Sequence, residues 1–169
     1  MNNETNLQGK EAIDKVKKLV KEIDICLFCT SLKTNDGSTT RPMSTQDVDD
    51  EGNLWFFSDK DSEKNKEIEK DNKVQLLFAD PSKSKYLVLN GEAEIIIDYK
   101  KVEELWTPLV KVWFTKGKDD PSLSIVKVTS KSAYYWDVEG NKMINFFKMI
   151  ASLATGEEHL DVKEGKLNL

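Results

Sequence analysis

The sequence predicts a mainly β (α+β) protein in which six to seven antiparallel strands curl into a barrel flanked by helices. Short apolar or alternating runs recur along the chain, with turn residues between them. Other stretches show the 3.6-residue apolar spacing of amphipathic helices. At 169 residues the chain suits one domain, residues 1–169, with a single core.

Composition excludes several classes of partner. The chain has 25 Lys+Arg against 30 Asp+Glu, a net charge of −5, and no basic run, so we expect no nucleic-acid partner. No apolar run approaches the roughly 20 residues that span a bilayer, so we expect no membrane partner. The N-terminus lacks the basic and apolar regions of a signal peptide, and we expect a cytoplasmic protein.

The first half of the chain predicts a helix and two hairpins. Residues 1–9 are polar and predict a disordered tail. Apolar residues at helical spacing from Ala12 to Ile23 predict a helix that caps an open end of the barrel. A strand over 25–32 and a strand over 40–48 form the first expected hairpin. A turn over 49–53, containing Gly52, joins the second of these to a strand over 54–58.

The second half predicts three helices and the remaining strands. A helix over 62–70 precedes a strand over 73–79 and a long strand over 85–97, in which Gly91 predicts a bulge or bend. Asp98 can cap a helix over 99–106. Strands over 123–129 and 132–136 are expected to form a hairpin through Ser130 and Lys131. A helix over 143–156 carries many large apolar residues, which pack either on its own barrel or across a dimer interface.

The two cysteines have the spacing of a metal or redox motif, but their context favours core thiols. Cys26 and Cys29 lie in an apolar, strand-like run, where positions three apart point to opposite faces. A zinc site would need further ligands, and His159 is the only histidine. We therefore predict no metal site.

The stretch from Arg41 to Ile68 contains the candidate site. The helix that starts near Ser62 brings free backbone N–H groups, a hydroxyl and the Lys64 ammonium together, as small phosphate sites do. Arg41 is the only arginine among 25 basic residues, and its planar fork matches a phosphate or a polar ring edge. The alternative is that Arg41 forms a surface ion pair.

The sequence offers no catalytic group of its own. His159 has no histidine partner, no serine lies in a glycine-flanked elbow, and the Gly-x-Gly-x-x-Gly motif is absent. An enzyme of this sequence would need a cofactor. A cofactor with a phosphate and a planar ring would fit, because the phosphate suits the helix start and the ring suits an apolar slot along the strand that contains Arg41.

The same residues resemble the FMN-binding core of the general stress protein 26 family, a branch of the pyridoxamine 5′-phosphate oxidase-like split barrels. The resemblance rests on Arg-Pro-Met-Ser-Thr-Gln at 41–46, Trp-Phe-Phe-Ser at 55–58 and Asp-Ser-Glu-Lys at 61–64, and continues through 91–93, 113–121 and 133–137. It implies a six- to seven-stranded antiparallel split β-barrel, FMN as cofactor, and a homodimer with the flavin site at its interface.

The resemblance also implies roles for individual residues. The flavin ring and ribityl chain would be lined by Arg41, Pro42, Met43, Ser44 and Gln46. Phe57 and Ser58 would flank the chain, Ser62 and Lys64 would hold the phosphate, and Trp113 would reach the flavin from the partner protomer. The alternative for Trp113 is a core aromatic.

Two departures limit the functional expectation. Glu63 stands where pyridoxamine phosphate oxidases have an arginine beside the lysine, and no arginine after Arg41 can supply their substrate-binding Arg-x-His pair. We therefore expect no vitamin B6 oxidation. The resemblance implies an FMN-binding stress-type protein, either a flavin-dependent oxidoreductase for a small unidentified substrate or a non-catalytic flavin-binding regulatory protein. A barrel that has lost its cofactor is a third possibility, and Glu63 supports it.

Overall fold

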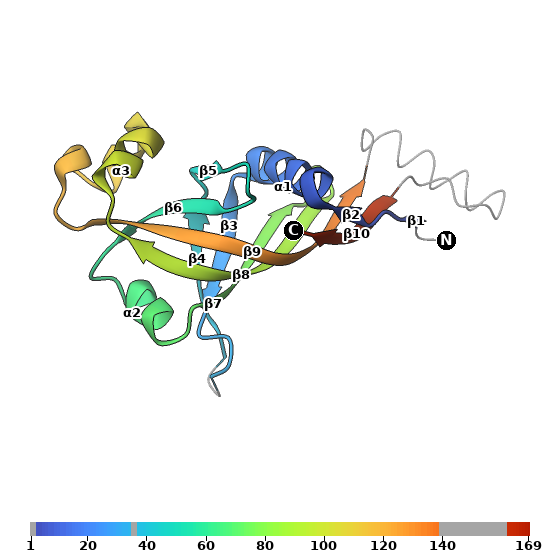
Figure 1. Cartoon of the computed structure of the whole chain (residues 1–169), viewed down its shortest axis with the longest axis horizontal. Helices are drawn as coiled ribbons and strands as arrows, with labels where there is room; N and C mark the ends of the chain where they lie inside the picture. Colours follow the sequence, from blue (N-terminus) through green and yellow to red (C-terminus); the bar gives the residue numbers. More distant parts are fainter. Residues whose placement is uncertain (1–2, 35–36, 139–161) are drawn as a thin grey trace.

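The computed structural model describes residues 3–34, 37–138 and 162–169 (Figure 1). The helix predicted over 143–156 lies outside the described residues. The described strands are β1 (Asn3–Glu4), β2 (Leu7–Gln8), β3 (Ile25–Thr30), β4 (Thr39–Ser44), β5 (Asp47–Val48), β6 (Leu54–Asp59), β7 (Lys73–Asp80), β8 (Lys85–Ile96), β9 (Leu123–Val138) and β10 (Val162–Asn168). The helices are α1 (Gly9–Ile23), α2 (Glu63–Lys70) and α3 (Tyr99–Leu105), with short 3₁₀ helices η1 (Pro108–Val112) and η2 (Gly117–Asp119).

One sheet contains all ten described strands. Its order is β1-β10-β9-β8-β7-β3-β4, and β6 adds to the first half of β9. Neighbours are antiparallel except β1 and β2, which run parallel to β10. Seven of the ten strands have six or more residues, so the predicted mainly antiparallel architecture of six to seven strands is confirmed. None of the described helices is both long and apolar enough to cross a membrane.

The two longest strands, β8 and β9, pair with each other along the length of the sheet (Figure 1). The hairpin predicted through Ser130 and Lys131 is wrong, because β9 continues through these residues as one strand. Gly91 pairs with Ser130 and Asn90 pairs with Ser132, so Lys131 is the extra residue of a β-bulge. This shift in register confirms the irregularity predicted at Gly91. Glycine is needed there because a Cβ atom would lie 2.6 Å from the Thr129 carbonyl oxygen.

The ends of the chain differ from the prediction. Residues 3–4 and 7–8, expected to be disordered, form short strands beside β10, which the sequence analysis did not predict. The close approach needs Gly165, where a Cβ atom would lie 2.3 Å from the Thr5 carbonyl oxygen. The polar sequence of residues 3–8 does not indicate these strands, because their pairing partners in β10 lie about 160 residues away.

The apolar face of α1 forms part of the main core. Ala12, Val16 and Leu19 are fully buried there, together with the edge-to-face pair Phe28 and Phe56, whose ring centroids are 5.3 Å apart. A second cluster lies beside α3 and η1 and contains Trp55, Val102, Leu105, Val110, Phe114, Leu123 and Ile125. The helices predicted over 62–70 and 99–106 are confirmed as α2 and α3.

The sheet is open between β4 and β6. The hairpin predicted over 40–58 forms only near its turn, where Asp47 of β5 pairs with Trp55 of β6. β4 pairs with β3 instead, and among the described strands no pairing joins β4 to β6. The chain leaves the sheet at Thr45 and Gln46, between these two segments. This opening is where the candidate site lies.

Candidate functional site

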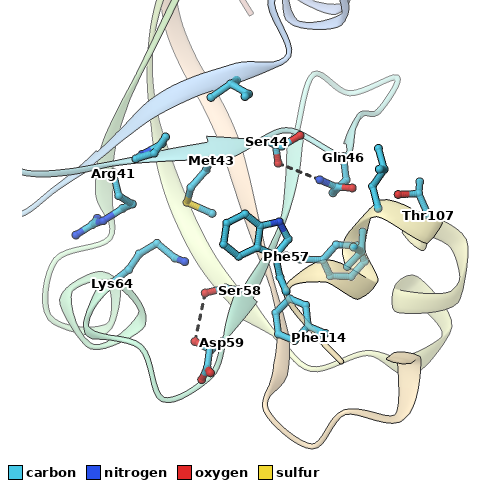
Figure 2. Close-up of a pocket in the computed structure, with 15 residues that line it drawn as sticks. Arg41, Met43, Ser44, Gln46, Phe57, Ser58, Asp59, Lys64, Thr107 and Phe114 are labelled. Atoms are coloured by element: carbon cyan, nitrogen blue, oxygen red, sulfur yellow. Dashed lines mark hydrogen bonds between the residues drawn. The ribbon is translucent and has the colours of Figure 1, made fainter. Parts of the chain in front are cut away.

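A cleft of about 740 Å³ lies between β4, β6, the start of α2 and η1 (Figure 2). Its lining consists of Ile25, Arg41, Pro42, Met43, Ser44, Gln46, Phe57, Ser58, Asp59, Lys64, Thr107, Leu109, Val110, Trp113 and Phe114. Nine of the ten residues that the sequence analysis assigned to a flavin are in this set, and Ser62 is the exception. Segments far apart in the chain thus meet in one cavity.

Lys64 supplies an unneutralised positive charge at one end of the cleft. Figure 2 shows its ammonium directed toward Ser58. Among the described residues, none forms a hydrogen bond or ion pair with this ammonium. Burial and the nearby Arg41 guanidinium lower the pKa of Lys64 to about 8, although Asp59 opposes the shift. A partly buried cation without a partner is suited to an anionic ligand.

The first turn of α2 adds backbone donors beside Lys64. The Ser62 hydroxyl caps the helix by accepting the Asn65 N–H at 3.3 Å, and the Ser62 N–H donates to the Asp59 carbonyl at 3.1 Å. Within the described part of the chain, the N–H groups of Glu63 and Lys64 have no acceptor. Ser62 therefore acts by shaping this turn rather than by lining the cleft.

Glu63 lies away from the cleft. Its side chain is 80% exposed and pairs with Lys66 at 2.6 Å, three residues along the same helix. It is absent from the cleft lining. The negative charge that the sequence places beside Lys64 therefore faces solvent, where it is screened.

Arg41 lines the cleft and also forms an ion pair. Its Nη2 donates to Glu67 Oε2 at 2.8 Å, and its Nη1 donates to Thr30 Oγ1 at 2.6 Å. Burial would raise the pKa of Glu67, but the hydrogen bonds from Thr30 and Arg41 outweigh it and lower that pKa. The alternative of an ion pair is therefore met in part, and the expected contact of Arg41 with a flavin stays a prediction. The ion pair is four-fifths buried rather than on the surface, and it ties β4 to α2.

The other end of the cleft has an apolar wall. Phe57 packs edge-on against Trp106 and Phe114, with ring centroids 5.9 and 6.3 Å away. Trp113 follows η1, is 83% exposed and lines the cleft of the same chain, so it is not a core aromatic. The charged lining residues Arg41, Asp59 and Lys64 all lie outside this wall.

Six lining residues were missed as site residues: Ile25, Asp59, Thr107, Leu109, Val110 and Phe114. Four of them lie in or beside η1, a five-residue 3₁₀ helix. Its sequence, Pro-Leu-Val-Lys-Val, is followed by Trp-Phe. The sequence did contain a signal for these residues. The apolar run from Pro108 to Phe114 lies in and directly after a helix too short to bury all of its side chains, and exposed apolar side chains often line a binding site.

The prediction of buried core thiols is confirmed. Cys26 and Cys29 are both free and buried. Burial raises the pKa of the Cys26 thiol to about 12, which keeps it protonated and unreactive. No cluster of potential metal ligands occurs among the described residues.

Comparison with known proteins gives a consistent result for sequence and fold. Protein bli-3 of Neurospora crassa is 25% identical over 130 residues, which cover 66% of this chain and 62% of that protein. The matched stretch thus spans less than two thirds of that relative. A crystal structure assigned to general stress protein 26, from Jannaschia sp. CCS1, superposes with a TM-score of 0.77 at 19% identity, covering 95% of this chain and 99% of the other.

A second structure is the general stress FMN/FAD binding protein of Xanthomonas citri. It is 27% identical, with a TM-score of 0.66, and the match covers 78% of this chain and 92% of the other. The family model described as pyridoxamine 5′-phosphate oxidase like matches residues 11–161, which contain every residue of the cleft. This chain therefore belongs to the pyridoxamine 5′-phosphate oxidase-like family.

Proposed function

We propose that this protein binds FMN in the cleft between β4 and β6, and that the flavin makes it an oxidoreductase for a small, unidentified substrate. The observation that carries the proposal is the Lys64 ammonium, which lies partnerless among the described residues beside two free N–H groups of α2. These donors lie at one end of the cleft, and the wall that contains Phe57 and Phe114 at the other end is apolar. The flavin-binding relative from Xanthomonas citri supports the same assignment.

The chemistry of the cleft favours FMN over other flavins. FMN ends in a phosphate monoester that carries about −1.5 to −2 charges at neutral pH, the value for phosphorylated side chains. One ammonium and one helix N-terminus suit such a group. FAD has no terminal phosphate, and riboflavin has none at all. The volume of about 740 Å³ lies within the range of small-molecule sites.

We assign the residues as follows. Lys64 and the N–H groups of Glu63 and Lys64 would hold the phosphate, while Met43, Phe57 and Trp113 would flank the ring and exclude water. The residues at 44–46 would offer polar groups to the ring edge. Bound FMN would supply electron and hydride transfer, so no side-chain base is required.

The test is the visible absorption spectrum of the purified protein, before and after FMN is added and free flavin is removed by gel filtration. We expect a retained flavin band. Oxidation of NAD(P)H by the loaded protein would support the oxidoreductase, whereas a flavin inert to NAD(P)H would favour the non-catalytic regulatory alternative. No retained band with excess FMN would overturn the proposal.

We further propose that the protein is a homodimer with the flavin site at its interface. Apolar residues paired across the sheet, Pro42, Leu27, Leu77 and Val88, lie on its outer face, and Leu27 is 46% exposed. Pro42 also lines the cleft, so this face is continuous with the site. Exposed apolar surface of this kind is typical of an interface.

Sedimentation analysis tests the dimer. We expect the parent to sediment as a dimer and Leu27→Lys, with its charge on the outer face, to sediment as a folded monomer with weaker FMN binding. A monomeric parent would contradict the shared site. A monomeric variant that binds FMN as tightly as the parent would place the site within one protomer.

A further inference from the structure

A buried hydrogen-bonded network lies directly beneath the cationic end of the cleft. It joins Ser58 of β6, Asn65 of α2 and Ser124 of β9, which are 3%, 1% and 1% exposed. The Ser58 hydroxyl donates to Asn65 Oδ1 at 2.7 Å, and Asn65 Nδ2 donates to the Ser124 hydroxyl at 3.1 Å. The Ser124 hydroxyl donates to the Ser58 carbonyl at 3.0 Å, which closes the ring.

This network is unusual for a helix face that packs on a sheet. Ile68, three residues along the same face, is an ordinary buried apolar residue. Burying an amide and two hydroxyls is unfavourable unless every group is paired, and an apolar residue at position 65 could serve packing alone. The fully paired network instead fixes one orientation of α2 against two strands.

The orientation of α2 determines where the groups that could bind an anion lie, namely the Lys64 ammonium and the N–H groups of Glu63 and Lys64. Asn65 follows Lys64 directly, and its N–H is the one held by the Ser62 cap. The same residue thus occupies the cap with its backbone and locks the helix to the sheet with its side chain. The N–H groups of Glu63 and Lys64, in the same turn, have no acceptor among the described residues.

We infer that Asn65, held by Ser58 and Ser124, is a positioning residue for phosphate recognition, so that the network sets the preference of the cleft for a phosphorylated flavin. The inference rests on the proposed FMN site and names what gives it specificity. Asn65 and Ser124 do not line the cleft, so they act through the placement of Lys64 and the two amides.

The experiment compares the affinities of FMN and riboflavin, which share a ring and differ in the phosphate. We expect the parent to prefer FMN. We expect Asn65→Ala to bind FMN about ten-fold more weakly, the effect of losing one charge-assisted contact, and riboflavin within about two-fold of the parent. Ser124→Ala, which removes only one partner, should show the same selective loss at about three-fold.

Asn53→Ala is the matched control. Asn53 is a buried asparagine, 4% exposed, that donates to Asp49 at 3.0 Å and lies outside the cleft lining. It should keep the parental ratio of the two affinities. The inference would be overturned if Asn65→Ala and Ser124→Ala weakened the affinities for FMN and riboflavin equally, or left the ratio of these affinities unchanged. A purely structural role changes both affinities together. If Asn65→Ala does not fold, the Ser124→Ala ratio decides.

Failure of the proposed function gives a different result. If the parent binds neither flavin, FMN binding is overturned, and inorganic phosphate becomes the probe. Titration with phosphate should then shift the amide resonances of Glu63 and Lys64 in the parent and in Asn53→Ala, but not in Asn65→Ala. Equal shifts in all three proteins, or none in the parent, would overturn the positioning role.

Discussion

Lys15 and Lys64, two partly shielded lysines, have opposite surroundings. The Lys15 side chain is 13% exposed, and its ammonium lies 2.5 Å from the carboxylate of Asp137, which is 1% exposed. Lys85 lies 3.6 Å from the same carboxylate and also pairs with Glu22. Lys64 has no such partner among the described residues, and its pKa is lowered to about 8.

The difference separates Lys15, whose charge stabilises the fold through an ion pair, from Lys64, whose charge is available to a ligand. Asp137 forms ion pairs with both lysines, and these pairs tie α1 to the ends of β8 and β9. The fold gains nothing from burying Lys64, because a desolvated cation without a partner is unfavourable. Such a residue is retained where a ligand supplies the missing charge, and five predictions test this contrast.

The largest effect is expected from Asp137→Ala. Removing the carboxylate leaves Lys15 and Lys85 without their shared partner, and we expect a loss of about 3–5 kcal/mol in the free energy of unfolding, measured with urea. Asp50→Ala is the control, because its carboxylate pairs with Lys17 but is fully exposed, and we expect no measurable change. Equal losses in the two variants would contradict a special role for the buried cluster.

Acid should weaken the same cluster. Burial would raise the pKa of Asp137, but the hydrogen bond from Lys15 outweighs it and lowers that pKa. A carboxyl whose pKa is lower in the folded state stabilises above its unfolded pKa, about 3.9, and loses that contribution as the pH falls below it. The stability gap between the parent and Asp137→Ala should therefore narrow in acid.

Lys64→Met should separate binding from stability. We expect FMN affinity to fall about 30-fold, since a hydrogen bond to a charged group contributes about 2 kcal/mol. The free energy of unfolding should not fall, because no ion pair is lost. Lys15→Met should do the reverse, destabilising the protein while folded molecules bind FMN normally. A Lys64→Met protein that binds FMN as well as the parent would contradict the phosphate assignment.

The pH dependence of FMN binding should follow Lys64. The ammonium loses its proton as the pH rises past about 8, and a neutral amine attracts phosphate weakly. Below about 6 the phosphate itself gains a proton. Affinity should therefore be greatest between these values, and Lys64→Met should lose the alkaline decline. Because the folded pKa of Lys64 is lowered, the ligand-free protein should gain stability as the pH rises above 8. An alkaline decline of equal size in Lys64→Met would assign it to another group.

The smallest effect is expected from Glu63→Gln. The carboxylate is exposed and paired with Lys66, so we expect less than a two-fold change in FMN affinity, as for screened surface charges. Isothermal titration of the parent and variant would measure it. A gain of ten-fold or more would show that Glu63 opposes the phosphate and would support a barrel adapted to lose its cofactor.

The local sequence carried most of the site. Nine of ten assigned residues line one cleft, and eight of these fall in compact segments: residues 41–46 of one strand, 57–58 of the next, and the first turn of α2. Turn residues, the Ser62 cap and the Gly91 irregularity are also local features that depend on a few neighbouring residues. Interactions of this range can be read from one segment at a time.

The sequence by itself determined the strands and helices of the middle of the chain, the buried thiols and the serine-capped start of α2. Only the tertiary structure decided that β9 is one bulged strand and that β1 and β2 pair with β10. It also decided that the Arg41 guanidinium forms an ion pair with Glu67. It also decided that Asn65 meets Ser124, 59 residues away, while Lys64 meets no acceptor among the described residues. The reason is physical: pairing between distant segments depends on which surfaces the closed core brings together, and no local pattern records that.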